Sequence, residues 1–383
     1  MAPSATITDT QQLNGDTITT KITNSNVSSG NGITHSHQLE DKVRQYSRFG
    51  NPSLYVTPQH TIELKESPIP IPTETQVLIH VRATGVCGSD LHLWHQGKIG
   101  PLVVDHQHIL GHEAAGVVLA AGSAVSNLKP GDRVAIEPQI PCQTCFLCTS
   151  GKYNLCESVT FSGVCNGGQC KGALEIGRPA LICGAGPIGL VALASAKASG
   201  AWPLVITDME EQRLEFARRF VPGVKTYHVQ LSKTSLQSAE EIRHLFGCAG
   251  GRDVDRGISD SNEYNAPAVV LECTGVEPSV VTAAYTCRRS GLVMVVGVGR
   301  SIMNNLPFMH LSMAEIDLKF INRYSDTWPA GINALANGQV LNLDPLVTHT
   351  FPLESAVQAM ELCADRSKGS IKIQIVDDLE LSP

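Results

Sequence analysis

The stretch ALICGAGPIGLVALASAKASGA, residues 180–201, decides the fold of the second half of this chain. Its apolar start is typical of a buried strand, its glycines of a tight turn, and its Ala- and Leu-rich remainder of a helix. A strand followed by a helix recurs in PLVITDMEEQRLEFARRF, residues 203–220, and the later runs AVVLECTG and GLVMVVGVG indicate further strands. Because strands that alternate with helices form parallel sheets, we predict an α/β, doubly wound domain over residues 176–322.

The glycines of this stretch also predict a nucleotide site of the Rossmann type. Gly184, Gly186 and Gly189 have the spacing G-x-G-x-x-G between a strand and a helix, where a pyrophosphate approaches the helix N-terminus. Asp208 ends the next strand, where an acidic side chain accepts hydrogen bonds from ribose hydroxyls and repels a 2′-phosphate. NAD is therefore the expected cofactor, although Arg213, which follows shortly, leaves NADP open as an alternative.

The first half of the chain has the pattern of short strands. The runs QVLIHVRATG, AAGVVLAAG and DRVAIEP are separated by Gly, Pro and Asn, and they predict a β-rich domain over residues 46–175. Residues 1–45 include TNSNVSSGNG and lack an apolar period, so we expect a disordered tail. Residues 323–383 contain one helical pattern and a final strand, and we expect them to return to the first domain.

Composition excludes several classes of protein. The formal net charge is -7 and no run of Lys and Arg occurs, which argues against a nucleic-acid-binding surface. No apolar stretch approaches the ~20 residues of a membrane helix, and the N-terminus lacks a signal-peptide core, so we expect a cytoplasmic protein. The 12 cysteines fall at metal-ligand spacing or in apolar runs, which favours metal ligation and free thiols over disulfides.

Four of these cysteines predict a structural zinc site. The spacing C-x2-C-x2-C-x7-C lets one loop wrap an ion in four thiolates, as a closed tetrahedral zinc site requires. Scattered buried cysteines and an iron-sulfur cluster are the two alternatives. The four predicted ligands are Cys142, Cys145, Cys148 and Cys156.

A second metal pattern lies upstream. Cys87, His112 and Glu113 supply a thiolate, an imidazole and a carboxylate, and three protein ligands leave a position for water or substrate at a catalytic zinc. From the residues alone, a core thiol with an exposed His-Glu pair is at least as good an interpretation. His106 and His108 in DHQH, residues 105–108, are interpreted as surface loop histidines and not as metal ligands.

The motifs CGSD, GHEAAG, the four-cysteine loop and G-x-G-x-x-G occur in this order, and together they resemble the medium-chain zinc dehydrogenases. The resemblance implies that the β-rich domain is GroES-like, that Cys87, His112 and Glu113 hold a catalytic zinc, and that the chain forms a homo-tetramer. It implies that Ser89 and His92 help to carry a proton outward. It also implies a cofactor contact for four further residues, Pro187, Ile188, Val296 and Arg323.

The segment RYSDTWP, residues 323–329, is similar to RYCNTWP of the polyol dehydrogenases. In that branch the Arg and Tyr reach the polyol hydroxyls, a role that would fall to Arg323 and Tyr324; a surface pair that caps a loop is the alternative. AIEPQIPCQTC, PLVITDMEEQRLEFA and ECTGVEPS are most similar to the fungal L-arabinitol 4-dehydrogenases. The resemblance thus implies NAD-linked oxidation of L-arabinitol to L-xylulose, with xylitol or sorbitol as the alternative substrate.

The segment between Cys156 and the glycine turn is shorter than the family pattern. It lacks barrel strands, a crossover helix and a GALLEPLSVA-like motif whose glutamate lies at the catalytic zinc. Glu175, in GALE, either corresponds to that glutamate or is an ordinary exposed loop residue. The shortening keeps two other interpretations open: a non-catalytic nucleotide-binding remnant, or a chain truncated by an incorrect gene prediction.

Overall fold

The structure, a computed structural model, describes residues 39–100, 102–161, 174–248, 262–300, 302–340, 342–379 and 381. The chain divides into two compact units. The first consists of Met1–Cys165 with Val347–Pro383, and the second of Asn166–Leu346. Within the described ranges, no helix is both long enough and apolar enough to cross a membrane.

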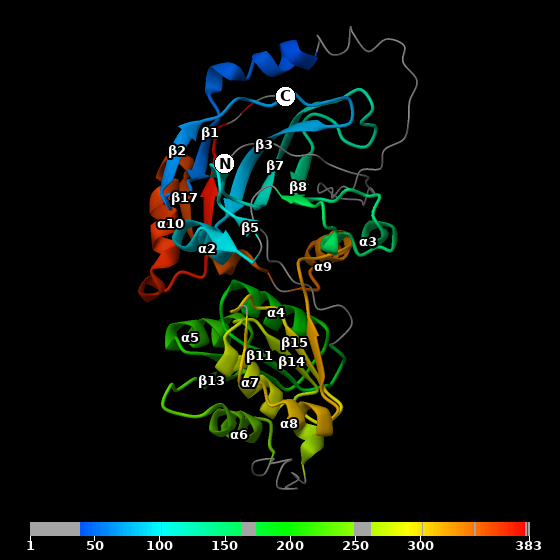
Figure 1. Ribbon diagram of the computed structural model, residues 1–383, viewed down its shortest axis with the longest axis vertical. Coiled ribbons are helices and arrows are strands. Elements are labelled where there is room, and N and C mark those ends of the chain that lie inside the picture. Colours follow the sequence, from blue (N-terminus) through cyan, green and yellow to red (C-terminus); the bar gives the residue numbers. More distant parts are fainter. Residues whose placement is uncertain are drawn as a thin grey trace. The chain divides into compact units, whose positions relative to one another are not determined.

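The second unit contains a six-stranded parallel sheet in the order β13-β12-β11-β14-β15-β16 (Figure 1). The chain runs outward from β11 in one direction and then from β14 in the other, so these two strands flank the point where the order reverses. Ligands bind outside the carboxyl ends of the strands at such a point. The six strands are β11 (Ala180–Cys183), β12 (Leu204–Asp208), β13 (Lys225–His228), β14 (Val269–Glu272), β15 (Leu292–Val295) and β16 (Asp317–Phe320).

Helices cover both faces of this sheet. Alternate residues of a strand point to opposite faces, and Leu181 and Cys183 pack in one cluster with Ile242 and Val280 from two of the helices. On the other face, Leu271 and its neighbours pack with residues that include Ala192 of α4. The predicted doubly wound sheet is therefore confirmed. The helices of the second unit are α4 (Pro187–Ala198), α5 (Glu211–Phe220), α6 (Ser235–Leu245), α7 (Glu277–Thr286) and α8 (Phe308–Met313), followed by α9 (Trp328–Ala336), which has no buried residues.

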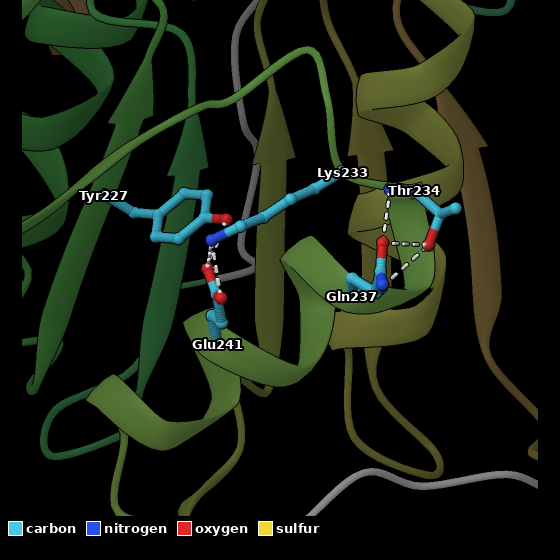
Figure 2. Close-up of polar contacts among 5 residues, drawn as sticks. All are labelled: Tyr227, Lys233, Thr234, Gln237 and Glu241. Carbon is cyan, nitrogen blue, oxygen red and sulfur yellow. Dashed lines mark hydrogen bonds and ion pairs between the residues drawn. The ribbon is translucent and has the colours of Figure 1, made fainter.

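Polar contacts hold α6 against the edge strand β13, as Figure 2 shows. The Glu241 carboxylate accepts hydrogen bonds from the Tyr227 hydroxyl at 2.8 Å and from Lys233 Nζ at 2.6 and 2.7 Å. At the helix start, Thr234 Oγ1 accepts from Gln237 N at 3.2 Å and Gln237 Oε1 accepts from Thr234 N at 2.9 Å. These contacts satisfy backbone groups that a helix start leaves without partners.

The first unit is built from antiparallel and mixed sheets, in agreement with the β-rich domain predicted from the short apolar runs (Figure 1). A five-stranded sheet has the order β17-β18-β3-β7-β8, and a three-stranded sheet has the order β2-β1-β6. Their strands are β1 (Pro52–Val56), β2 (Ile62–Glu66), β3 (Val77–Gly85), β6 (His108–Ile109), β7 (Glu113–Ala121), β8 (Arg133–Ala135), β17 (Val347–Pro352) and β18 (Lys372–Val376). The remaining elements are α2 (Gly88–Gln96), α3 (Phe146–Thr149), α10 (Ala356–Ala364), β4 (Lys98–Ile99), β5 (Leu102–Val103), β9 (Gln139–Ile140) and β10 (Thr160–Phe161).

The C-terminal strand completes the core of the first unit. β18 pairs in parallel with β17 and antiparallel with β3, so the last strand of the chain lies beside one of the earliest. Ile373 and Ile375 of β18 are buried in one cluster with Leu54 of β1 and Met360 of α10. The predicted return of the chain end to the first domain therefore has a clear physical basis in strand pairing and burial.

Two predicted boundaries differ from the structure. Residues 39–44 are helical, and Val43 and Tyr46 pack in the core, so the tail predicted for residues 1–45 is wrong at its C-terminal end because apolar burial orders it. The chain returns to the first unit at Val347, where β17 begins, and not at residue 323, because α9 lies in the second unit. Much of the shortened segment, residues 162–173, lies outside the described residues.

Candidate active site and zinc centres

Two neighbouring strands and one helix start bring Cys87, His112 and Glu113 together. Gly85, the last residue of β3, pairs with Glu113, the first residue of β7. Cys87 follows Gly85 closely and is the N-cap of α2, while His112 directly precedes Glu113. As a result, one ligand atom from each of the three side chains lies within 4.8 Å of the other two.

A fourth residue, Asp90, supports this cluster, and the sequence analysis missed it. One carboxylate oxygen accepts a hydrogen bond from Cys87 N at 3.0 Å, and the other accepts from Gly111 N at 3.3 Å. The same carboxylate lies 3.4 Å from His112 Nδ1, and both side chains are buried. A carboxylate beside the second ring nitrogen orients a metal-ligating histidine. The spacing in CGSD, which puts the carboxylate at the third position of α2, was the available signal.

The surroundings of the His112 ring indicate whether these residues fit a metal ion. Among the described residues, its buried Nε2 atom has no hydrogen-bond partner, an arrangement that is costly for a polar atom. Burial works against the charged ring, yet the Asp90 carboxylate and the Cys87 thiol raise the pKa of His112 well above its ordinary value. The pocket thus favours a positive charge beside the imidazole. Thiolate, imidazole and carboxylate are the donors that zinc takes, so the residues fit zinc.

Lys372, on the C-terminal strand, also reaches this cluster. Its ammonium forms an ion pair with Glu113 Oε2 and donates to the Val86 carbonyl oxygen at 3.0 Å. Although burial opposes the charge, Glu113 and Cys87 keep the pKa of Lys372 above its ordinary value. The contact therefore fixes one Glu113 oxygen beside the ammonium group of Lys372. Local sequence gave no signal for it, because only the pairing of β18 with β3 brings the lysine near Glu113.

The four-cysteine loop has the dimensions of a zinc site. The Sγ atoms of Cys142, Cys145, Cys148 and Cys156 all lie within 4.8 Å of one another, and all four are free thiols. The Sγ of Cys148 lies 3.9 Å from that of Cys142 and 3.5 Å from that of Cys145. Four sulfurs around zinc at ~2.3 Å stand roughly 3.8 Å apart, whereas a disulfide requires ~2.05 Å.

Backbone hydrogen bonds prepare one of these thiols for metal binding. Thr144 and Cys145 donate backbone N–H bonds to Cys142, and they lower the pKa of the Cys142 thiol to about 6. Cys142 N in turn donates to the Cys156 sulfur at 3.3 Å. Because the thiolate is the ligating form, these donors favour the species that zinc binds.

In the second unit, the glycine turn has the geometry that a pyrophosphate requires. Gly184 has φ +98°, in the left-handed region, and Gly186 is the N-cap of α4. A Cβ atom on Gly189 would strike the Gly184 carbonyl, so only glycine allows this close packing of helix and strand. Pro187 occupies the first turn of α4, where its missing N–H costs nothing, and Ile188 is partly exposed beside it.

Asp208 and Arg213 flank this turn. The Asp208 carboxylate accepts hydrogen bonds from Ala185 N at 2.7 Å and from Glu210 N at 2.9 Å. If Gly186 carried a Cβ atom, that atom would lie 3.7 Å from Arg213 Nη1. Within the described chain, Arg213 Nε is buried and has no hydrogen-bond partner. The guanidinium therefore lies beside the turn predicted to hold the pyrophosphate, while Asp208 is tied to the backbone of the same turn.

The other predicted site residues are placed as follows. Ser89 Oγ lies 3.3 Å from Cys87 Sγ, and His92 is partly buried one turn later on α2. Val296 follows β15 directly and is partly buried. Tyr324 is 8% exposed and packs edge-on against Trp328 at 5.6 Å between ring centroids. Its neighbour Arg323 has φ +62° and, like Tyr324, belongs to the second unit.

Glu175 is placed as an exposed loop residue. Its carboxylate forms an ion pair with Arg178 Nε, and both side chains are about half exposed. The cluster of Cys87, His112 and Glu113 belongs to the first unit, whereas Glu175 belongs to the second. Among the two interpretations of this residue, the observed contacts agree with the simpler one, an ordinary loop glutamate paired with a neighbouring arginine.

Comparisons with known proteins agree with both units. Residues 73–175 match the alcohol dehydrogenase GroES-like domain, and residues 187–337 match the zinc-binding dehydrogenase family. The L-arabinitol 4-dehydrogenase of Talaromyces emersonii is 43% identical over 342 residues, covering 80% of this chain and 86% of that protein. The sorbitol dehydrogenase of Homo sapiens is 37% identical over 350 residues, covering 81% and 92%.

Solved structures support the fold. The L-idonate 5-dehydrogenase of Escherichia coli has a TM-score of 0.70 at 24% identity, covering 85% of this chain and 98% of that one. A zinc-dependent alcohol dehydrogenase of Streptococcus pneumonia has a TM-score of 0.71 at 22% identity, covering 86% and 99%. With a GroES-like unit, a Rossmann-type unit and relatives of this identity, the chain belongs to the medium-chain zinc-binding dehydrogenases, in the enzyme branch that contains the L-arabinitol and sorbitol dehydrogenases.

Proposed function

We propose that this enzyme oxidises a secondary alcohol of a polyol to a ketose, with zinc in its first unit and NAD as the hydride acceptor. The observation that carries the proposal is that one ligand atom from each of Cys87, His112 and Glu113 lies within 4.8 Å of the other two. One of these residues, His112, has a buried Nε2 atom with no hydrogen-bond partner among the described residues. L-Arabinitol is the best candidate substrate and L-xylulose its product, because several of the most similar relatives bear the name L-arabinitol 4-dehydrogenase. Xylitol and sorbitol are the nearest alternatives.

Different residues of the chain have different roles in this reaction. When bound, zinc would supply a Lewis acid that lowers the pKa of the substrate hydroxyl, and NAD would supply the acceptor for the hydride of the carbinol carbon. Cys87, His112 and Glu113 hold the metal, and Asp90 fixes the His112 ring. Ser89, next to the Cys87 sulfur, and His92 receive the hydroxyl proton and pass it outward. Arg323 and Tyr324 orient the polyol by contacts with its hydroxyls.

The proposal extends to the cofactor and to a second zinc. Asp208 receives the adenosine ribose, the turn from Gly184 to Gly189 receives the pyrophosphate, and Val296 and Arg323 contribute further cofactor contacts. The four-cysteine loop holds a structural zinc, which gives two zinc ions per chain. The cytoplasmic location expected from the sequence stays a prediction.

The first test is a direct assay of the full chain loaded with zinc. We expect NADH formation at 340 nm with L-arabinitol, slower reaction with xylitol and sorbitol, none with ethanol, and a lower rate with NADP than with NAD. Cys87→Ser should lower kcat by at least about a hundredfold, since loss of a ligand exceeds the 10- to 100-fold effect of losing an outer partner. A soluble, zinc-loaded chain that binds NADH but oxidises no polyol would instead support the nucleotide-binding remnant.

Gly85 provides a sharper test of the metal cluster. A Cβ atom on Gly85 would overlap the Glu113 carboxylate, whereas in the described structure a Cβ on Gly88 meets nothing within 4 Å. Gly85→Ala should therefore displace Glu113 and remove one of two zinc ions per chain, and Gly88→Ala should keep both. Elemental analysis after dialysis measures the count. Equal zinc in the two variants would contradict a role for Glu113 in holding the metal.

A substitution of Asp208 tests the preference for NAD over NADP. Asp208→Ser removes the acceptor for ribose hydroxyls, and losing a hydrogen bond to a charged group costs about 1.5–3 kcal/mol, or roughly ten- to a hundredfold in KM for NAD. The ratio of kcat/KM for NADP to that for NAD should rise. Glu210→Gln, which removes a neighbouring exposed charge, is the matched control and should leave the ratio unchanged. An unchanged ratio in Asp208→Ser would overturn the assignment.

We also propose that the chain forms a homo-tetramer and that its second unit contributes an interface. β16 lies at the edge of the six-stranded sheet, and nearby apolar side chains on β16 and α8 are exposed: Phe308, Met309, Met313 and Phe320. An apolar patch beside an unpaired strand edge is typical of an association surface. Light scattering should show a smaller assembly for Met313→Lys with Phe320→Lys. Leu231→Lys, at an exposed leucine elsewhere in the unit, should leave the mass unchanged.

A further inference from the structure

A third group of metal-ligand side chains lies in the loop between β5 and β6. Asp105, His106 and His108 each offer one ligand atom, and these atoms lie within 4.8 Å of one another. The sequence analysis interpreted the two histidines as ordinary surface residues. The structure brings both imidazoles to the same carboxylate, with Asp105 and His106 75% and 71% exposed, so the side chains are clustered and not separate.

The contacts within this cluster are close. Asp105 Oδ1 lies 2.6 Å from His106 Nδ1 and 3.8 Å from His108 Nε2. The two imidazole rings are 4.0 Å apart between centroids, tilted by 46°. Although the His108 side chain is 30% exposed, its Nε2 atom is buried and forms no hydrogen bond within the described part of the chain. A buried ring nitrogen that faces a carboxylate without a hydrogen bond is an incomplete arrangement.

The backbone holds these side chains in place. Val104 is buried, and its N–H donates to the Gly97 carbonyl at 2.8 Å, which fixes the start of the loop. His108 pairs with Val56 in the ladder between β6 and β1, which fixes its end. Because both ends are anchored, bringing the three side chains together costs less conformational entropy than in a free loop.

Two imidazoles and one carboxylate are the donors of a transition-metal site. Nitrogen ligands favour Zn²⁺, Ni²⁺, Cu²⁺ or Co²⁺ over Mg²⁺ and Ca²⁺, which prefer oxygen. His108 Nε2, which has no hydrogen-bond partner among the described residues, is available as a ligand atom. The Asp105 carboxylate, 2.6 Å from His106 Nδ1 and 3.8 Å from His108 Nε2, supplies the negative charge that a divalent cation would neutralise.

We propose that Asp105, His106 and His108 form a third metal site, separate from the thiolate sites, which binds Zn²⁺ or a similar transition-metal ion at the surface of the first unit. The remaining coordination positions face solvent. This ion would tie the loop to β6, the strand that leads directly toward His112. The site is independent of the dehydrogenase activity, since none of its three residues belongs to the catalytic cluster.

The test counts zinc in the full chain at buffered micromolar free Zn²⁺, with a chromophoric chelator as the competitor. We expect three zinc ions per wild-type chain and two in the double variant His106→Gln with His108→Gln. The chain contains a natural control, His35 and His37, which have the same H-x-H spacing near the N-terminus. His35→Gln with His37→Gln should keep all three ions.

A second measurement identifies the residues involved. Zinc should protect His106 and His108 from modification by diethyl pyrocarbonate, as detected by peptide mass spectrometry. Two zinc ions in the wild-type chain under these conditions, or a third ion that persists in the His106 and His108 variant, would overturn the proposal. The zinc ion of the Cys87 cluster is tested separately, because Gly85→Ala is expected to remove that ion and to leave this loop unchanged.

Discussion

The antiparallel pairing of β3 with β7 is the constraint on which the metal cluster depends. The register places Gly85 opposite Glu113, so the chain that leaves β3 and the chain that enters β7 must pass close to each other. Cys87 and His112 lie next to this pair in sequence and are carried to the same place. Both strands contain runs of buried residues, so a shift of one residue in their pairing would disturb the core as well as the arrangement of the proposed ligands.

Polar support around the ligands comes from the same local architecture. Asp90 satisfies the start of α2 and at the same time lies beside the His112 ring, so helix capping and ligand orientation use one carboxylate. Lys372 brings a compensating charge to Glu113 from the final strand. The absence of a Cβ on Gly85 leaves the space that the Glu113 carboxylate occupies. Stability of the first unit and metal binding therefore share several residues.

The second unit obeys a different constraint, the close packing of α4 on β11. Gly189 touches the Gly184 carbonyl, and this contact brings the N-terminus of α4 to the carboxyl edge of the sheet. Asp208 then ties β12 to the same turn through Ala185 N. The glycine turn and Asp208, which we propose to hold the pyrophosphate and the ribose, are thereby carried by adjacent parallel strands.

The sequence by itself determined the elements that act locally. Glycine spacing, apolar runs and cysteine spacing predicted the doubly wound sheet, the nucleotide turn and the four-cysteine loop, because each depends on residues close together in the chain. Only the tertiary structure decided the contacts between distant segments: Lys372 with Glu113, the return of the chain at Val347, and the burial of Val43 and Tyr46. It also decided that Asp105, His106 and His108 meet. Strand pairing and apolar burial set these contacts, and neither leaves a short-range pattern in the sequence.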